Sequence, residues 1–143
     1  MKKRRLGIIV LIFCFFLTGF FACKSEAEKK AEAKAYLDSG LAKNDDYKGE
    51  IEDYTKAIEL DPDYQMAYHN RGNAKRMLGD YAGAIKDFNK VLELGRKYGG
   101  VYYLRGLSKY GLGDKQGALE DLNKAEKLGV SEASGRIKEI KSK

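Results

Sequence analysis

The sequence predicts an all-α fold in which helical hairpins stack into a repeat solenoid. One pattern occurs three times, in segments that begin at residues 47, 81 and 115 and are therefore 34 residues apart. The segments read YKGEIEDYTKAIEL (47–60), YAGAIKDFNKVLEL (81–94) and KQGALEDLNKAEKL (115–128). A fixed period of this length indicates stacked helical units that bury a continuous core between them.

Each period contains a second helical run, which precedes the recurrent segment. The runs 65–78 and 99–112 show helical spacing of apolar residues and end at the pairs Gly79-Asp80 and Gly113-Asp114. Gly and Asp provide the turn geometry that ends one helix and begins the next. Pro62 follows the first recurrent segment and cannot continue its helix. The sequence therefore predicts helical pairs joined by short turns.

The first unit departs from this pattern. Gly40 and Gly72 are only 32 residues apart, so the turn at 44–46 is about two residues short. Glu50 stands where the later copies have Ala84 and Ala118. Terminal repeats are commonly atypical, because one of their faces meets water. Upstream, the sequence SEAE (25–28) is a capping box, which predicts that the first helix begins near Glu26.

A last helix is expected after the third copy of the pattern, within residues 130–143. Ser131 can cap it, and one stripe of the helix is apolar. The stripe consists of Val130, Ala133, Ile137 and Ile140. Such a helix would cover the apolar end of the array and present charged residues to solvent.

The N-terminal segment has the composition of a secretory signal. A basic cluster at residues 2–5 precedes Leu6 to Ala22, a run without any charge, and the chain is highly charged from Lys24 onward. We assign residues 1–22 to a signal peptide. The alternative is an uncleaved single-pass membrane anchor, although the run is slightly shorter than the roughly 20 apolar residues that span a bilayer.

Cys23 lies at the boundary between the apolar run and the charged chain, directly after Ala22. This arrangement resembles the lipobox of bacterial lipoproteins, although Phe20 and Phe21 depart from its usual residues. The resemblance implies lipidation of Cys23, a short tether over residues 23–30, and attachment to a bacterial membrane in the cell envelope. The protein would face the periplasm or the cell surface.

Signal cleavage and lipidation would change both the thiol count and the charge balance. Cys14 would be removed and Cys23 modified, which leaves no free thiol for a disulfide or a metal site. The whole chain has a formal net charge of +6, but four of its 27 basic residues and no acidic residue lie in the signal segment. The remainder is nearly neutral, so net charge gives no argument for nucleic-acid binding. We expect no cofactor and no metal.

The stretches AYHNRGNAKRMLGDYAGAIKDFNKVLELG (67–95) and VYYLRGLSKYGLGDKQGALEDLNKAEKLG (101–129) resemble tetratricopeptide repeats (TPR). In each, an aromatic residue (Tyr68 or Tyr102) precedes Gly72 or Gly106, and Leu-Gly-Asp follows. The resemblance covers about residues 31–129 and implies three repeats, at about 31–64, 65–98 and 99–129. It also implies a concave groove lined by the first helix of each pair.

Residues four and seven apart share one face of a helix, which defines the stripe expected to line the groove. The candidate partner-binding residues are Leu37, Leu41, His69, Asn73, Arg76, Tyr103, Leu107 and Tyr110. The groove would be apolar and aromatic at its ends and polar at its centre, which suits an extended segment or an amphipathic helix of a partner. The alternative is that some of these residues only pack against neighbouring helices.

The best-understood groove of this family clamps a C-terminal carboxylate with lysine, asparagine and arginine side chains. The matching positions in this chain hold Leu37, Leu41, Asn70, Gly100 and Leu104, and only Asn70 agrees. The resemblance therefore does not imply that mode of binding.

Several charged and small residues recur with the period. Arg71 and Arg105 precede the repeat glycines, and we expect them to pair with the recurrent Asp87 and Asp121 rather than to bind an anion. Lys43, Lys75 and Lys109 are expected on a solvated face. The recurrent Gly49, Gly83 and Gly117 are expected to permit close packing.

No enzymatic activity is predicted. The chain has one histidine, no remaining thiol nucleophile and no phosphate-binding glycine loop. The main hypothesis is a membrane-tethered protein-interaction module that binds a peptide segment or helix of an envelope partner. The alternatives are a self-associating scaffold subunit, including a homodimer, and an accessory subunit of an envelope enzyme.

Overall fold

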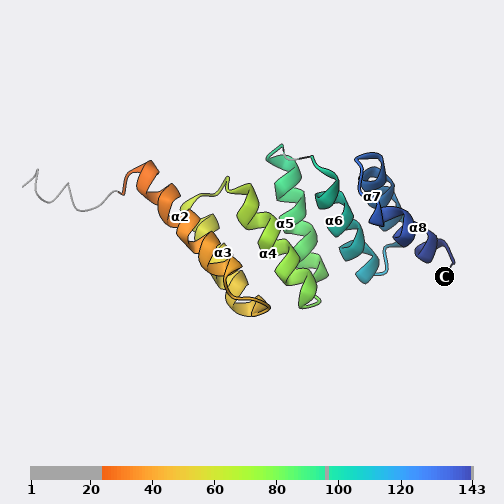
Figure 1. Cartoon of the computed structure of the whole chain (residues 1–143), viewed down its shortest axis with the longest axis horizontal. Coiled ribbons are helices and arrows are strands. Elements are labelled where there is room, and N and C mark those ends of the chain that lie inside the picture. The colour runs from red at the N-terminus through yellow and green to blue at the C-terminus, as the bar shows by residue number, and fades with distance from the viewer. Residues whose placement is uncertain (1–23, 96, 143) are drawn as a thin grey trace, which may run out of the picture.

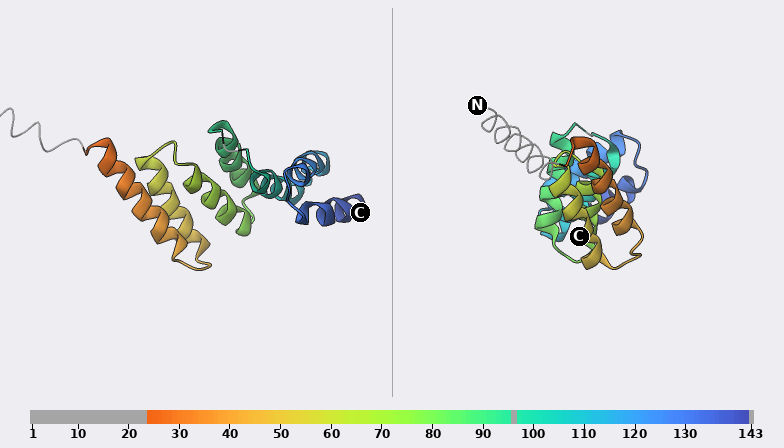
Figure 2. Two further views of the ribbon diagram at one scale, coloured as in Figure 1. Left: turned by 45° about the horizontal axis from the view of Figure 1, so that its top comes forward. Right: turned by 90° about the vertical axis from the view of Figure 1, so that its left-hand side faces the viewer.

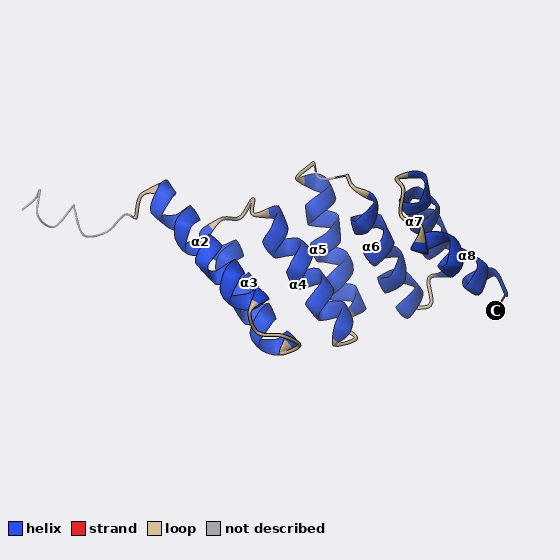
Figure 3. Ribbon diagram, viewed as in Figure 1, coloured by secondary structure: helices blue, strands red, loops and turns tan. Residues whose placement is uncertain are grey.

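The computed structural model describes residues 24–95 and 97–142, and this part of the chain consists of seven helices and no strand (Figure 3). In order, the helices are α2 (Glu26–Leu41), α3 (Tyr47–Leu60), α4 (Gln65–Met77), α5 (Tyr81–Glu93), α6 (Gly99–Gly111), α7 (Lys115–Lys127) and α8 (Glu132–Ser142). The recurrent segments coincide with α3, α5 and α7. The prediction of an all-α repeat solenoid is confirmed.

The helices follow one another along the long axis of the molecule, with α2 and α8 at opposite ends (Figures 1 and 2). The pairs α2–α3, α4–α5 and α6–α7 form antiparallel hairpins, and each helix also contacts the next one along the chain. The first helices α4 and α6 touch one another as well. This arrangement gives an elongated molecule with an extended surface.

An aspartate caps the second helix of each hairpin and explains the recurrent glycines. The carboxylates of Asp46, Asp80 and Asp114 accept hydrogen bonds from the backbone N–H of Gly49, Gly83 and Gly117. A Cβ atom at any of these glycines would overlap the capping carboxylate. The glycines therefore provide space for the cap, rather than for packing between helices. The capping box at Ser25 and Glu28, predicted from the sequence, is confirmed.

The turn of the first hairpin differs from the other two. Helices α4 and α6 end five residues after Gly72 and Gly106, and each is followed by a glycine with positive φ, Gly79 (81°) or Gly113 (84°). Helix α2 ends only one residue after Gly40. The turn that follows contains Asn44 and Asp45 with φ values of 38° and 70°. The first hairpin thus lacks the last turn of its first helix.

Three clusters of buried side chains form the core, one for each part of the array. The first lies between α2, α3 and α4 and includes Leu37 and Tyr54. The second is built around Phe88 and Val101, and the third around Leu122 and Ile137. Repeat glycines allow the helices of a hairpin to approach, because the Phe88 ring lies against Gly72 and the Leu122 side chain against Gly106. The close packing of these small and large residues stabilises the stack.

Buried ion pairs join the two helices of each later hairpin, as the sequence predicted for the arginines. Arg71 donates from Nε and Nη2 to both carboxylate oxygens of Asp87, at 2.9 and 2.7 Å. Arg105 pairs in the same way with Asp121, at 2.7 and 2.6 Å. In the first hairpin Ser39 takes the arginine's place and donates to Asp53 at 2.7 Å.

The prediction that the recurrent lysines form a solvated face is wrong. Their Nζ atoms lie within 3.0 Å of the same buried aspartates, in the pairs Lys43–Asp53, Lys75–Asp87 and Lys109–Asp121. Each aspartate therefore accepts from two side chains, which lie on the first helix of its hairpin or, for Lys43, in the turn after it. The sequence did not reveal this because a lysine at helical spacing is equally compatible with solvent.

Helix α8 closes the array as expected. Ala133, Ile137 and Ile140 are buried, and Val130 packs against the same cluster. Counted by the 34-residue period, Glu139 occupies the place of Arg71 and Arg105, and Ile140 the place of Gly72 and Gly106. Helix α8 thus takes the position of a further first helix without its characteristic residues.

The predicted signal peptide (1–22) and the lipidation site Cys23 lie outside the described residues. Helix α2 already begins at Glu26, within the segment 23–30 that we assigned to a tether. Across residues 24–95 and 97–142, no helix has both the length and the apolar character needed to cross a membrane.

Candidate functional site

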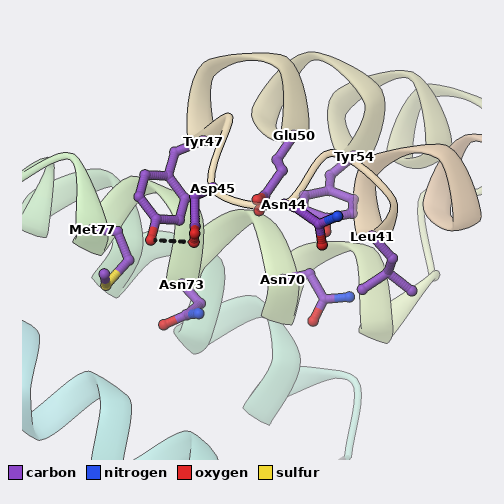
Figure 4. A pocket seen from close by; sticks show the side chains of 9 residues that line it. All are labelled: Leu41, Asn44, Asp45, Tyr47, Glu50, Tyr54, Asn70, Asn73 and Met77. Atoms are coloured by element: carbon purple, nitrogen blue, oxygen red, sulfur yellow. Dashed lines mark hydrogen bonds between the residues drawn. The ribbon is translucent and has the colours of Figure 1, made fainter.

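A pocket of about 330 Å³ lies between the first hairpin and α4 (Figure 4). The side chains that line it come from the end of α2, the turn after it, α3 and α4. They are Leu41, Asn44, Asp45, Tyr47, Glu50, Tyr54, Asn70, Asn73 and Met77. Side chains of α3 and the preceding turn face those of α4 across the pocket (Figure 4).

The unusual turn of the first hairpin positions one side of the pocket. Because α2 ends early, Leu41 is exposed, and the left-handed backbone at Asn44 and Asp45 follows directly. Tyr47 donates a hydrogen bond from its hydroxyl to Asp45 Oδ1 at 3.0 Å. Left-handed residues other than glycine are strained by about 1 kcal/mol or more, and such strain is often found at binding sites.

Two acidic groups give the pocket its electrostatic character. Burial raises the pKa of the Glu50 carboxyl, and the negative charge of Asp45 raises it further. Burial also raises the pKa of the Tyr54 hydroxyl to about 12, with a contribution from Glu50. Tyr47 has a raised pKa because its hydroxyl donates to Asp45, and the positive charge of Arg76 opposes that shift. The pocket is therefore polar and acidic.

The structure brings two of the predicted groove residues into this pocket, Leu41 and Asn73. Leu41 is 52% exposed and so offers apolar surface to a partner. Leu37 is only 3% exposed and belongs to the first core cluster, which leaves it little surface for a partner.

The remaining predicted residues of α4 form a polar stretch beside the pocket. Arg76 donates from Nε and Nη2 to Asn73 Oδ1 at 3.3 and 3.0 Å. One turn toward the start of α4, the Nδ1 atom of His69 lies 2.8 Å from the hydroxyl of Tyr98. The His69 ring also meets the edge of Phe88. These contacts hold the side chains along one face of α4.

The predicted residues of the third repeat are half-buried. Tyr103 and Tyr110 pack against the C-terminal core cluster, which contains residues of α6, α7 and α8. Leu107 is half-buried as well. Packing thus covers part of these three side chains, and the remaining part is exposed to a partner.

Sequence reasoning missed Asn44, Asp45, Tyr47, Glu50, Tyr54 and Met77 as lining residues. Two signals pointed to them: the short turn at 44–46 and Glu50 in place of the alanine of the later copies. We attributed both to the exposed end of the array. The structure shows instead that they form one wall of the pocket.

The stacked hairpins, the small repeat residues and the capped second helices define a helical-repeat protein of the interaction-module class. Two family models, both described as tetratricopeptide repeat, match residues 41–64 and 63–129. The chain therefore belongs to the tetratricopeptide repeat family, as its sequence indicated, with residues 41–129 matched. A search of curated proteins by sequence found no match.

Solved structures support the same fold. The first TPR of Spaghetti (RPAP3), bound to the HSP90 peptide SRMEEVD, is 26% identical with a TM-score of 0.75, over 79% of this chain and 93% of that one. The second TPR domain of human RPAP3, in complex with the HSP70 peptide SGPTIEEVD, is 25% identical with a TM-score of 0.73, over 83% and 100%. YrrB, a TPR protein with an unusual peptide-binding site, is 27% identical with a TM-score of 0.65, over 71% and 55%.

Proposed function

We propose that this protein is a non-enzymatic interaction module that binds an extended segment or a helix of a protein partner. The observation that supports this most directly is the pocket between the first hairpin and α4, which joins the face carrying Asn73 and Arg76. The similar TPR domains of RPAP3 are bound to peptides, which supports a peptide or protein partner here.

The mode of binding is expected to differ from that of a carboxylate clamp. Four of the five positions that match the clamp residues carry Leu37, Leu41, Gly100 and Leu104, none of which is basic. Leu37 is buried and Leu41 contributes apolar surface, so neither attracts an acidic tail. The pocket itself contains two carboxylates, which would repel an acidic group of the partner.

We further propose that the module is held at a bacterial membrane in the cell envelope by lipid on Cys23. Two acyl chains give stable attachment, whereas one is marginal. Only two residues separate Cys23 from Glu26, where α2 begins. The array would then stay close to the membrane surface. An uncleaved N-terminal anchor is the alternative form of the same proposal.

Affinity capture with a matched control tests the binding function. The tagged full chain is expressed in a bacterial host, solubilised in detergent, and its co-purifying proteins are quantified by mass spectrometry. Leu41→Glu and Leu112→Glu make the same change at two exposed leucines, but only Leu41 lines the pocket. We expect Leu41→Glu to lose a partner that the wild type and Leu112→Glu retain.

If both variants lose the partner equally, or if both retain it, this face has no role in binding. Light scattering of the purified chain checks the homodimer alternative. A stable dimer that Leu41→Glu dissociates would favour a scaffold role over binding of a different protein.

A further inference from the structure

The residues that line the pocket differ from those at the equivalent positions of the second junction between repeats. Between the second and third repeats, the positions of Glu50, Asn70 and Asn73 carry Ala84, Leu104 and Leu107. The positions of Tyr54 and Met77 carry Phe88 and Gly111 there. The Tyr81 ring covers Gly111 so closely that an added Cβ would lie 2.7 Å from the ring.

The comparison between junctions shows how the first one differs. Met77 occupies the glycine position, so Tyr47 does not take the place that Tyr81 takes one repeat later, and its hydroxyl instead bonds to Asp45. Apolar side chains have been replaced by a carboxylate, two amides and a phenol. Polar groups in a half-buried position are unfavourable unless they are hydrogen-bonded. Tyr54 belongs to the first core cluster, but packing does not require the carboxylate and the two amides.

The two carboxylates of the pocket have no cationic partner within the described ranges 24–95 and 97–142. None of the ion pairs there includes Asp45 or Glu50. The buried Asp53, Asp87 and Asp121, in contrast, each pair with at least one basic side chain. Arg76 lies beside the pocket, but its hydrogen bonds go to Asn73 and to the Met77 sulfur, within its own helix.

The other lining groups suit the chemistry of a long cationic side chain. The half-buried Tyr47 ring offers an aromatic face, which attracts an ammonium or guanidinium group, whereas Tyr54 is buried beneath the pocket. Asn44 and Asn70 carry amide oxygens, which accept hydrogen bonds from such a group, whereas the Asn73 oxygen already accepts from Arg76. Leu41 and Met77 provide apolar surface for the methylene stem. A metal ion is disfavoured, because the described residues contain no group of three or more His, Cys, Asp or Glu side chains able to hold one.

From this combination we propose that the pocket binds the cationic side chain of a lysine or arginine in the partner's bound segment. Asp45 and Glu50 provide the opposite charge, Tyr47, Asn44 and Asn70 orient the cationic head, and Leu41 and Met77 contact its stem. This inference rests on the proposed function and specifies the partner, which presents a basic residue at this position.

Small-molecule probes test the pocket without knowledge of the partner. The isotopically labelled full chain in detergent micelles is titrated with the methylamides of N-acetyl-lysine, N-acetyl-arginine and N-acetyl-norleucine. We expect both cationic probes to shift the side-chain amide signals of Asn70 and Asn73 with millimolar dissociation constants. The uncharged norleucine probe should shift them at least about fivefold less, since it cannot form charge-assisted hydrogen bonds with the carboxylates.

Two charge-neutralising variants in the same helix locate the effect. Glu50→Gln keeps the shape of the side chain and should raise the dissociation constants of the cationic probes about fivefold or more, whereas Glu52→Gln, at an exposed position outside the pocket, should leave them unchanged. Equal binding of norleucine, or an equal response of both variants, would overturn the inference. If the probes do not bind but the partner is captured, the cation site is rejected and the proposed function stands. If the probes bind but no partner is captured, the proposed function is rejected.

Discussion

At the scale of single residues, the first turn of α5 shows why a glycine recurs at this position. Gly83 donates its backbone N–H to Asp80 Oδ1 at 2.9 Å, and the carboxylate occupies the space that a Cβ would need. Gly135 in α8 is the opposite case, because a Cβ there would meet no atom within 4 Å. The two glycines therefore predict different responses to the same substitution.

Gly135→Ala is expected to raise the free energy of unfolding by about 1 kcal/mol, because alanine is the better helix former. Gly83→Ala should give no such gain, since displacing the Asp80 cap costs about 1 kcal/mol. Urea denaturation followed by circular dichroism measures both values. Equal stabilisation by the two substitutions would contradict the role of Gly83 in making room for the cap.

Asp87 forms ion pairs with two basic side chains of the second repeat. It accepts from Arg71 and from Lys75, and its side chain is only 5% exposed. Asp87→Ala would leave two half-buried cations without their partner, which costs about 3 kcal/mol. The same denaturation experiment checks this, with the exposed Lys86→Ala on the same helix as the control. A loss below about 1 kcal/mol would show that solvent replaces the pair.

At the scale of helices, the arginines link not only a hairpin but also its neighbour. Arg71 Nη1 donates to Thr55 Oγ1 of α3 at 3.1 Å, and Arg105 Nη1 donates to Asn89 Oδ1 of α5 at 2.7 Å. Each arginine thus contacts the second helix of its own repeat and that of the preceding repeat. Hydrogen bonds of this kind couple adjacent repeats, whose interfaces carry much of the stability of a solenoid.

Acid should weaken these connections. Burial raises the pKa of the Asp121 carboxyl, but hydrogen bonds from Arg105 and Lys109 outweigh burial and lower its pKa overall. The Asp53 carboxyl has a lowered pKa for the same kind of reason. A carboxyl whose pKa is lower in the folded than in the unfolded state stabilises the protein at pH values above its unfolded pKa, near 3.9. This stabilisation is lost as the pH falls through the pKa of the folded state.

We therefore expect the free energy of unfolding to decrease steadily below about pH 4. Asp121→Asn should be less stable than the wild type at pH 7 and should show a weaker decrease in acid. Asp63→Asn, at an exposed position, is the control and should retain the wild-type profile. Parallel profiles for wild type and Asp121→Asn would exclude Asp121 as a source of the acid sensitivity.

The sequence predicted helices more completely than it predicted the pocket. The bounds of α3, α5 and α7 follow from caps and apolar spacing, which are local properties, and the Arg–Asp pairs follow from their recurrence. The pocket depends on where α2 ends and on how Tyr47 lies relative to Met77, which are properties of two hairpins packed together. Glu50 signalled a departure from the pattern, but only the packed structure shows that it faces Asn70 and Asn73.

At the scale of the whole molecule, the position of Cys23 bears on how the array would be presented. We expect the wild-type chain in a bacterial host to partition with membranes, and Cys23→Ser to move to the soluble fraction or to remain as an unprocessed precursor. Cys14→Ser, in the segment removed on cleavage, should behave as the wild type. Mass spectrometry of the purified protein should find diacylglycerol on Cys23; an intact chain that still begins with Met1 would contradict processing.

Helix α8 has a consequence for how the number of repeats can change. It lies where a fourth hairpin would begin, but Glu139 carries the charge opposite to the linking arginines, and Ile140 fills the space that a repeat glycine leaves for the next helix. A duplicated unit added after residue 143 would therefore meet a surface that does not accept it. We therefore expect an added repeat to be accommodated upstream of α8 rather than after it, so that α8 limits the array at this end.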